Sequence, residues 1–449
     1  MGSPDRSPPV IHLGRLLFFQ EIRGLLVSPS LWIMMIITSL LIGYGFQQAV
    51  TLFSRASATA LAYPDMAAGM DPLSGVFVPT FGALYLTSTL LLPFTAIRII
   101  GRDKHSGVLR LLLQLDISPL RLCLIKMGAL FLTVLIGYGL SALGVVVCWR
   151  LLGGTLVWPE LLVMFCGHAL YALTVAAIGM CAAAITDTLP TAAMLCLGVT
   201  LGSWVLDFTL ASRAAGAGYL GSLSLIGLLR HFENGLLSSH YLLSFAALIL
   251  FFFLLAVIWL HPGVKRCKKI YGSAAALLFC GAIIVPAALF PLHADVTENR
   301  RHSFDPDITR ALRSLSHPLT ITVHLSPEDS RLHDIENGVL AKLRRTVPKL
   351  KVVYADSGSG GLFDGSGDEL YGLLEYAYQG KTDRSYSSSS REILSIIFAL
   401  AGLPLVEERQ SGYSGHPLVG DGGYCRLLFF CFLPLGLLVA GIICSRGKL

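Results

Sequence analysis

Long uninterrupted apolar segments dominate the hydrophobic pattern of the chain. Eight of them approach the roughly 20 apolar residues that a helix needs to cross a bilayer. They run approximately over Leu31–Ala49, Phe77–Ile97, Met127–Cys148, Leu161–Ile185, Thr191–Phe208, Tyr241–Leu260, Tyr271–Leu289 and Leu427–Cys444. The pattern predicts eight membrane-spanning helices, and the fourth and fifth form a tight hairpin because only Thr186–Pro190 separates them.

The pattern changes between residues 293 and 424, where short helical and alternating segments replace the long apolar ones. The predicted order is helix, strand, helix, strand, strand and helix, over Pro306–Leu315, Leu319–Leu325, Leu332–Thr346, Lys351–Tyr354, Leu373–Tyr378 and Arg391–Gly402. A Gly/Ser/Asp-rich loop over Asp356–Gly367 separates the last two strands. This order predicts an α/β domain with a small mixed sheet.

Composition supports this division. Of the 449 residues, 54% are apolar and 14% are charged, against about 25% charged residues in soluble domains. Residues 293–424 hold 18 acidic and 14 basic residues, a net charge of −4, whereas the rest of the chain holds 10 acidic and 20 basic residues, a net charge of +10. These values exclude an ordinary cytosolic enzyme, a disordered chain and a nucleic-acid binder, and they favour a basic membrane part joined to a mildly acidic soluble part.

Lysine and arginine near the span ends predict the orientation of the spans. With the N-terminus in the cytosol, the inner loops hold 15 basic residues and the outer edges hold five. The even number of spans then returns the C-terminus to the cytosol. Residues 293–424 are therefore expected on the extracytosolic side of a bacterial cytoplasmic (inner) membrane.

A short amphipathic segment precedes the first span. Apolar residues recur at helical spacing, with basic residues on the opposite side, as shown by Ile11, Phe18, Ile22 and Leu25 against His12, Arg15 and Arg23. This pattern is typical of an interfacial elbow helix on the inner leaflet. The alternative is an N-terminal extension of the first span, but Ser28-Pro29-Ser30 favours a break because proline is tolerated at a helix start and not inside a helix.

The longest cytosolic connection, Arg98–Lys126, contains a second short helix. Gly107 precedes an apolar helix over Val108–Leu115, and Asp116–Pro119 ends it. Ser118 is suited to cap the next helix, with Pro119 at its first position. A soluble partner could push such a helix as a rigid body; the alternative is a connecting loop that only covers lipid headgroups.

This loop resembles the signature of ABC transporter permeases of the type 2 exporter class. The matching residues are Asp103, Gly107, Leu109, Leu112, Leu113, Ser118 and Lys126, and the departures are Asp103 for the usual Glu, Val108 for Thr and Asp116 for Pro. Ser222–Tyr241 is similar to the outer segment before the sixth span of the same permeases. The resemblance covers about residues 11–260.

The resemblance implies a permease subunit that binds a separate ATPase through its elbow helix and this loop. The implied elbow residues are Arg15, Phe18, Ile22 and Arg23. The implied coupling residues are Asp103, Gly107, Val108, Leu109, Leu112, Leu113, Ser118, Pro119 and Lys126. ATP and Mg²⁺ would belong to the partner. A P-loop requires GxxxxGK[ST], whereas Glu375 replaces the first glycine before Gly380-Lys381-Thr382; the chain itself is not expected to be an enzyme.

The extracytosolic segment resembles a truncated form of the soluble domain of GldG, an auxiliary component of the gliding-motility ABC transporter. The resemblance is carried by Asp295–Asn299, Arg301–Ser303, Thr320–Val323 and Gly372–Lys381. The chain therefore looks like a fusion of a GldF-like permease and a GldG-like part. We expect a binding or assembly domain, because neither HExxH nor GxSxG occurs and its histidines have no ligand spacing.

Three residues inside the spans are further candidates. An ionisable residue in a membrane is expensive and suggests a role, so His168 either lines a transport path or makes an interhelical hydrogen bond. Gly198 and Gly202 form a GxxxG pair that permits close helix packing, for example at a dimer seam. No CxxC pair or other metal-ligand set is present in the sequence.

The sequence thus predicts a membrane all-α fold, a six-span permease bundle plus two further spans, with one extracytosolic α/β domain. The predicted parts are residues 1–30 (elbow), 31–260 (permease), 261–292 (basic linker and seventh span), 293–424 (outer domain) and 425–449 (eighth span and cytosolic tail). The leading hypothesis is the permease subunit of an ATP-driven exporter, a homodimer or heterodimer, in contact with membrane lipid and envelope proteins and without nucleic acid. The alternatives are a non-transporting anchor whose outer domain recruits envelope proteins, and, more weakly, a membrane enzyme.

Overall fold

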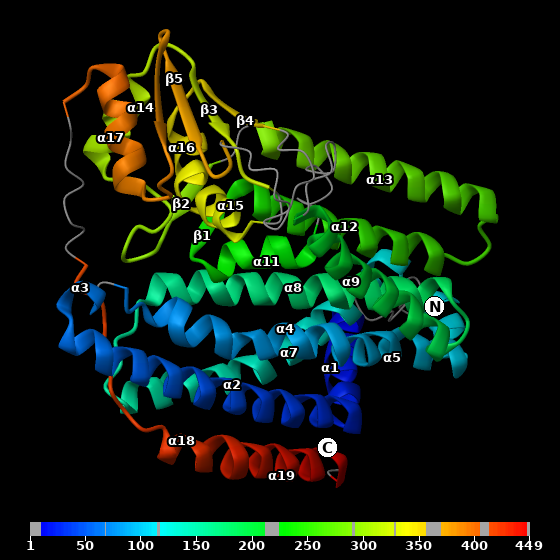
Figure 1. Ribbon diagram of the computed structural model, residues 1–449. Coiled ribbons are helices and arrows are strands. Elements are labelled where there is room, and N and C mark those ends of the chain that lie inside the picture. The colour runs from blue at the N-terminus through cyan, green and yellow to red at the C-terminus, as the bar shows by residue number, and fades with distance from the viewer. Residues whose placement is uncertain are drawn as a thin grey trace, which may run out of the picture. The chain divides into compact units, whose positions relative to one another are not determined.

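A computed structural model describes residues 10–67, 69–114, 117–211, 224–289, 292–326, 329–355, 370–404 and 413–446 (Figure 1). Within these residues, eight helices are long and apolar enough to cross a membrane. The described residues form two compact units, the larger within residues 10–207, 224–294 and 414–446 and the smaller within residues 208–211 and 295–413.

The eight long helices coincide with the eight predicted segments, which confirms that these segments are helical and long and apolar enough to cross a membrane. They are α2 (Pro29–Ala62), α4 and α5 (Val78–Leu90 and Leu92–His105, preceded by a π-helical turn η1, Leu73–Phe77), α7 (Pro119–Leu151), α8 (Trp158–Ile185), α9 (Leu189–Ala211), α12 (Ser239–Leu260), α13 (Arg266–Leu289) and the series α18 (Gly423–Leu427), η3 (Leu428–Phe432) and α19 (Leu433–Arg446). Most are longer than the apolar segments because their polar ends remain helical.

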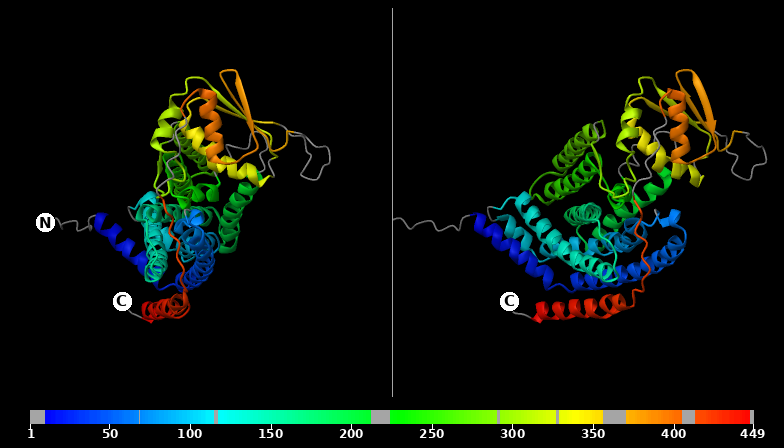
Figure 2. Two further views of the ribbon diagram at one scale, coloured as in Figure 1. Left: turned by 60° about the vertical axis from the view of Figure 1, so that its left-hand side comes forward. Right: turned by 90° about the vertical axis from the view of Figure 1, so that its left-hand side faces the viewer.

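Side-chain packing holds the larger unit together. Helix α2 packs against α4 and α19, and α8 packs against α5 and α12 (Figures 1 and 2). Trp149 is fully buried and meets the rings of Phe53 and Phe77 edge-on, with centroids 5.8 Å apart in each case. Gly43 lets η3 approach α2 closely, because a Cβ there would lie 2.3 Å from the Cβ of Phe429.

Among the residues that the structure describes, shorter elements join or flank the spans of this unit: α1 (Val10–Leu26), α3 (Pro64–Ala67), α6 (Val108–Gln114), α11 (Leu225–Glu233) and β1 (Leu236–Ser238). Strand β1 pairs with β2 (His293–Asp295). The predicted break before the first span is confirmed, because Ser28 is extended (φ −77°, ψ 121°) and Pro29 begins α2. Helix α1 is therefore not a continuation of α2.

The smaller unit is a two-layer α/β fold. Its sheet has the order β4-β3-β5-β6, formed by β4 (Leu350–Tyr354), β3 (Leu319–Val323), β5 (Leu374–Tyr378) and β6 (Lys381–Ser385). Strands β3 and β4 are parallel and the other pairs are antiparallel, which confirms the predicted mixed sheet. Alternating side chains of β3 and β5 are buried together with residues of α14 (Pro306–Arg313), α16 (Ala341–Thr346) and α17 (Ser390–Ala401).

Two details of the smaller unit differ from the predictions. The helix expected over Leu332–Thr346 consists of α15 (Ser330–Ile335), a π-helical turn η2 (Glu336–Leu340) and α16. Strand β6 was not predicted, because four of its five side chains are exposed and it has no apolar alternation. The predicted loop over Asp356–Gly367 lies outside the described residues.

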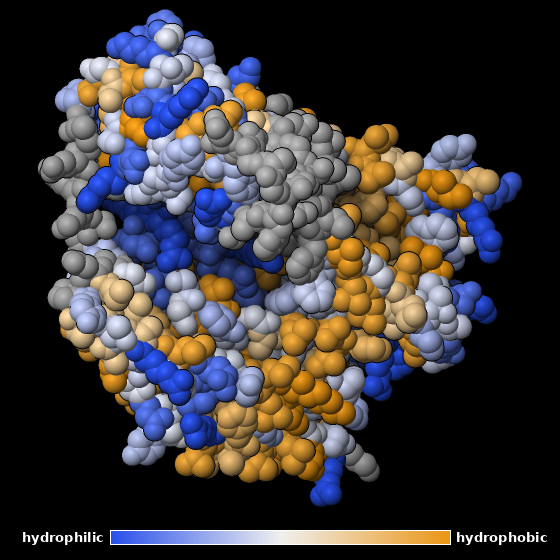
Figure 3. Space-filling model, in the orientation of Figure 1, coloured by the Kyte–Doolittle hydropathy of each residue, from blue (hydrophilic) through white to orange (hydrophobic). Residues whose placement is uncertain are grey.

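The surface of the larger unit matches a membrane environment. Hydrophobic side chains gather over the sides of the long helices, and hydrophilic side chains gather near helix ends such as the start of α13 (Figure 3). Exposed apolar residues occur on most of the long helices, for example Ile33, Ile136, Leu162 and Leu278. Such exposure is costly in water and favourable in lipid, so this surface agrees with the multi-pass interpretation of the sequence.

Candidate functional site: a buried ionic cluster beside a short helix

Three helices of the larger unit converge at the end of the bundle where basic residues are concentrated. Helix α1 supplies Glu21, the last turn of α5 supplies Asp103, and the third turn of α7 supplies Lys126. The Lys126 ammonium lies 2.5 Å from Glu21 Oε1 and 2.5 Å from Asp103 Oδ2. We call these three residues the ionic cluster. Lys126 lies 105 positions from Glu21 and 23 positions from Asp103 in the sequence.

The ionic cluster is buried and its cation has all its partners. Lys126 is 0% exposed, and Glu21 and Asp103 are also buried. A third donor direction of the ammonium points to the Ile99 carbonyl at 3.4 Å, which satisfies the three donors of a lysine. A buried charge that lacks a partner costs several kcal/mol, so each member of the ionic cluster depends on the others.

Arginine 102 balances the second carboxylate. Its Nε lies 3.7 Å from Asp103 Oδ1, and its guanidinium lies over Gly24 of α1, where an added Cβ would be 3.3 Å away. With Arg102, two cations face two carboxylates. Since Arg102 is half-exposed, it contributes less than Lys126 does to holding the helices together.

A second contact fixes the same end of α5. The Lys104 ammonium donates a hydrogen bond to the Thr186 carbonyl at 2.6 Å and lies 2.9 Å from Asp187 Oδ1. The hydrogen bond and charge of Lys104 lower the pKa of the exposed Asp187 carboxyl. The α8–α9 turn is thereby joined to the end of α5.

Helix α6 follows α5 and precedes α7 in the sequence, so it connects the two helices that supply Asp103 and Lys126. Gly107 has φ +77°, a backbone conformation that other residues rarely adopt, and it lets the chain turn from α5 into α6. Leu109 is buried, whereas Val108 and Leu111 are 40% and 63% exposed. The helix thus has apolar side chains packed against the bundle, Leu109 most deeply, and two exposed ones, Val108 and Leu111, that are free to contact a partner.

The predicted cap of the third span is confirmed. Ser118 is extended, its hydroxyl accepts a hydrogen bond from the Arg121 amide at 3.3 Å, and Pro119 begins α7. The helix predicted over Val108–Leu115 is described as far as Gln114. Leu115 and Asp116 lie outside the described residues.

The structure brings together only some of the predicted coupling residues. Asp103 and Lys126 meet in the ionic cluster, while Leu112 and Leu113 are half-buried against the core of the bundle. On the elbow helix, Phe18 and Ile22 are half-buried against that core, whereas Arg15 and Arg23 are exposed. The Arg15 guanidinium lies 5.8 Å from the Phe19 ring centroid.

Sequence reasoning missed Glu21. It follows Phe18 by three positions and precedes Leu25 by four, so it lies on the buried face of α1. It is also the only acidic residue of that helix. An isolated acid on the apolar face of a basic helix is the signal that could have identified it.

The candidate residues inside the spans lie outside the ionic cluster. His168 of α8 is buried at 3% exposure, but within the described residues neither ring nitrogen makes a hydrogen bond. Its Nε2 lies 3.4 Å from Glu233 Oε1 of α11 without a hydrogen bond. The interhelical hydrogen bond, one of the two predicted alternatives, is therefore not formed, and a role in a transport path stays a prediction. At Gly198 and Gly202 an added Cβ would meet no atom within 4 Å; the pair packs against no described helix of this chain, and a dimer seam there stays a prediction.

The smaller unit has polar clusters on its surface. Asp329 accepts hydrogen bonds from Arg331 at 2.7 Å and from the Tyr371 hydroxyl at 2.9 Å. The Arg331 hydrogen bond lowers the Asp329 pKa to about 2. Among the residues that the structure describes, no three His, Cys, Asp or Glu side chains are grouped to hold a metal ion.

Comparison with known protein families, with curated proteins and with solved structures finds no match for this chain.

Proposed function

We propose that the chain is the permease subunit of an ATP-driven transporter, with an ATPase on a separate subunit that docks at the basic end of the bundle. The observation that carries the proposal is the combination of an exposed apolar edge on α6 with the buried ionic cluster behind it. The proposal also rests on the resemblance of residues 98–126 to the coupling segment of type 2 exporters.

Helix α6 offers the contact surface. Val108 and Leu111 present exposed apolar side chains one helical turn apart, with Arg110 between them. Small apolar anchors surrounded by polar groups are common at the centres of protein interfaces. An ATPase with a matching apolar pocket and acidic rim would bind there.

The ionic cluster carries displacement into the bundle. A force on α6 acts on its two neighbours, α5 and α7, and the Glu21, Asp103 and Lys126 side chains tie both to α1. Because all three Lys126 donors have partners and the cluster is buried, the three helix ends would move as one body. Nucleotide binding by the partner would then shift the population of inward-open and outward-open states.

The smaller unit would receive cargo or bind an envelope component on the extracytosolic side. Its sheet has a face that is only half-buried, formed by Thr320, Thr322, Glu375 and Ala377, and its edge strand β6 is polar and exposed. Polar edge strands resist non-specific sheet pairing. These features support a binding role for this unit.

Co-purification from native membranes tests the docking surface. The variant Leu111→Glu places a charge on the exposed edge without disturbing buried Leu109. Val419→Glu is the control at a similarly exposed apolar residue that precedes α18. We expect an ATPase subunit to accompany the wild type and Val419→Glu, and its yield to fall about tenfold with Leu111→Glu.

Two results would contradict the proposal. One is that no nucleotide-hydrolysing subunit accompanies the wild-type chain. The other is that Leu111→Glu retains it at the wild-type level. Recovery of envelope proteins alone, dependent on residues 295–413, would favour the anchor function instead.

A further inference from the structure

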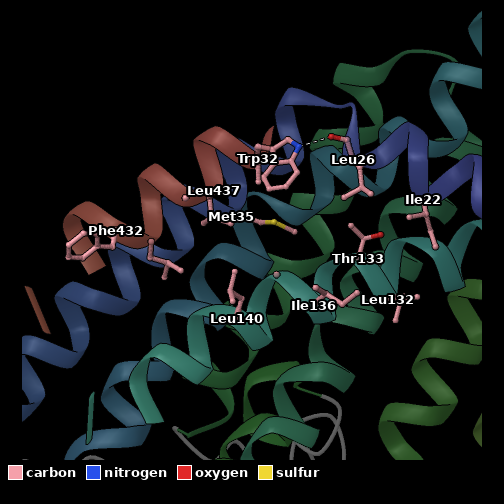
Figure 4. A pocket seen from close by; sticks show the side chains of 14 residues that line it. Ile22, Leu26, Trp32, Met35, Leu132, Thr133, Ile136, Leu140, Phe432 and Leu437 are labelled. Atoms are coloured by element: carbon pink, nitrogen blue, oxygen red, sulfur yellow. Dashed lines mark hydrogen bonds between the residues drawn. The ribbon is translucent and has the colours of Figure 1, made fainter. Parts of the chain in front are cut away.

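An apolar groove opens on the larger unit between α1, α2, α7 and the last span. It encloses about 310 Å³. Figure 4 shows its side chains, with Phe432 at one end, Ile22 and Leu132 at the other, and Trp32 and Met35 between them. All of its lining residues belong to helices of the larger unit.

The groove has no polar group left to bind a polar ligand. Its two lining residues with side-chain donors use them inside the protein: Trp32 Nε1 donates to the Leu26 carbonyl at 2.6 Å, and the Thr133 hydroxyl donates to the Ala129 carbonyl at 2.7 Å. The remaining lining is aliphatic, aromatic or glycine, apart from the weakly polar thioether of Met35. A polar ligand would lose its hydration without compensation, so the groove favours a hydrocarbon.

The dimensions fit one hydrocarbon chain. The lining runs along α7 from Leu132 to Leu140 and along the last span from Phe432 to Ala440, which is about 12 Å in each helix. Half of a bilayer's hydrocarbon core is about 15 Å thick. A second helix is about 10–12 Å wide with its side chains, which is too wide for this volume.

Positive charge lies at one end of the groove. Arg23 follows the lining residue Ile22 and is exposed, and Arg446 ends α19 about 9 Å beyond the lining residue Ala440. Neither arginine has an ion pair with a described residue. Helices α1 and α19 contact each other, so both charges belong to the same end.

We propose that this groove binds one acyl chain of an anionic phospholipid, with its phosphate held between Arg23 and Arg446. An annular lipid would exchange freely with the bilayer, whereas this lipid is selected by charge and by a shaped apolar site. The inference concerns lipid binding alone and does not depend on the proposed transport function.

Trp32 provides a direct reporter of the occupant. The full-length protein is reconstituted in phosphatidylcholine vesicles that contain a small fraction of phosphatidylglycerol with brominated acyl chains, which quench nearby tryptophan. The Trp32 signal is the difference between the wild type and Trp32→Phe. We expect it to be quenched about fivefold or more in excess of that from brominated phosphatidylcholine at the same fraction, since one arginine near the surface is worth about that factor.

Two further variants separate the acyl site from the charges. Gly436→Leu fills the groove where an added Cβ meets no atom within 4 Å, and it should remove the excess quenching without unfolding the protein. Arg23→Gln combined with Arg446→Gln should leave quenching but abolish the preference for the anionic lipid.

Each remaining outcome overturns the proposal. Equal quenching by both lipids in the wild type means an annular lipid only. Excess quenching that Gly436→Leu leaves unchanged places the lipid elsewhere. Protection of Trp32 from both lipids, together with a dimer by cross-linking, assigns the groove to a second copy of the chain.

Discussion

Two buried contacts among the described residues join a basic side chain to carboxylates, and they differ in how many partners the basic side chain has. Lys126 makes three contacts at hydrogen-bond distance inside the ionic cluster, whereas His168 makes a single contact with Glu233 and no hydrogen bond. Burying an ammonium is costly unless it has partners, whereas an imidazole is less costly to bury because it has a neutral form. We therefore expect the Lys126 contacts to hold the helices firmly, and the His168–Glu233 contact to be broken at a small cost in free energy.

The largest loss of stability is expected from a substitution at Lys126. Lys126→Met removes the cation and leaves Glu21 and Asp103 buried together, so we expect a loss of about 3–5 kcal/mol in the free energy of unfolding. Thermal unfolding in detergent measures it. Adding Glu21→Gln and Asp103→Asn should recover part of the loss, and a single variant as stable as the wild type would show that these charges do not hold the helices.

The attachment of α11 can be broken without touching a charge. A Cβ on Gly167 would lie 2.4 Å from the Phe232 Cβ, so Gly167→Ala should push α11, and Glu233 with it, away from α8. Overpacking of this kind costs about 1–3 kcal/mol. Gly139→Ala is the control, since its Cβ meets nothing within 4 Å; equal unfolding temperatures for the two variants would contradict the close approach.

The partly exposed ion pair of Asp329 with Arg331 in the smaller unit can be compared with the buried contacts of the larger unit. Because the Arg331 hydrogen bond lowers the Asp329 pKa from 3.8 to about 2, its stabilisation is present above pH 4 and is lost as pH falls toward 2. Arg331 is half-exposed, so Asp329→Asn should cost at most about 1 kcal/mol. Hydrogen exchange of the α15 amides, corrected for intrinsic rates, should rise in the variant at pH 7, and exchange that does not change would contradict this role.

The smallest effect is expected at His168 itself. His168→Leu keeps a similar volume and removes two ring nitrogens that have no hydrogen bond. Its contact with Glu233 is 3.4 Å long and the Glu233 side chain keeps 13% of its surface exposed, so the free energy of unfolding should change by less than about 1 kcal/mol. Thermal unfolding of His168→Leu and Lys126→Met in the same assay compares the contributions of the two contacts directly. A loss as large as that of Lys126→Met would mean that the two contacts are equivalent.

The fold was largely predictable where local chemistry decides it. The span helices, the break at Pro29, the Ser118 cap and the alternation of β3 all follow from residues within one or two turns of each other. Strand β6 could not be predicted because it forms by pairing with β5, as in Tyr378 opposite Lys381. Its exposed polar residues contain no period of their own.

The candidate site was predictable only in part. The loop resemblance pointed to Asp103 and Lys126, but it gave no reason for them to meet, and Glu21 was not selected at all. The direction of α6, with Leu109 inward and Leu111 outward, also depends on how that helix rests on the bundle.

By itself the sequence determined which segments are helical and apolar enough for a membrane, because hydrophobicity and helix capping act over a few neighbouring residues. Only the tertiary structure decided which charges share a buried space. Glu21 and Lys126 lie 105 positions apart, and their pairing arises because packing brings α1 against α7, after which a buried lysine is stable only with carboxylates beside it.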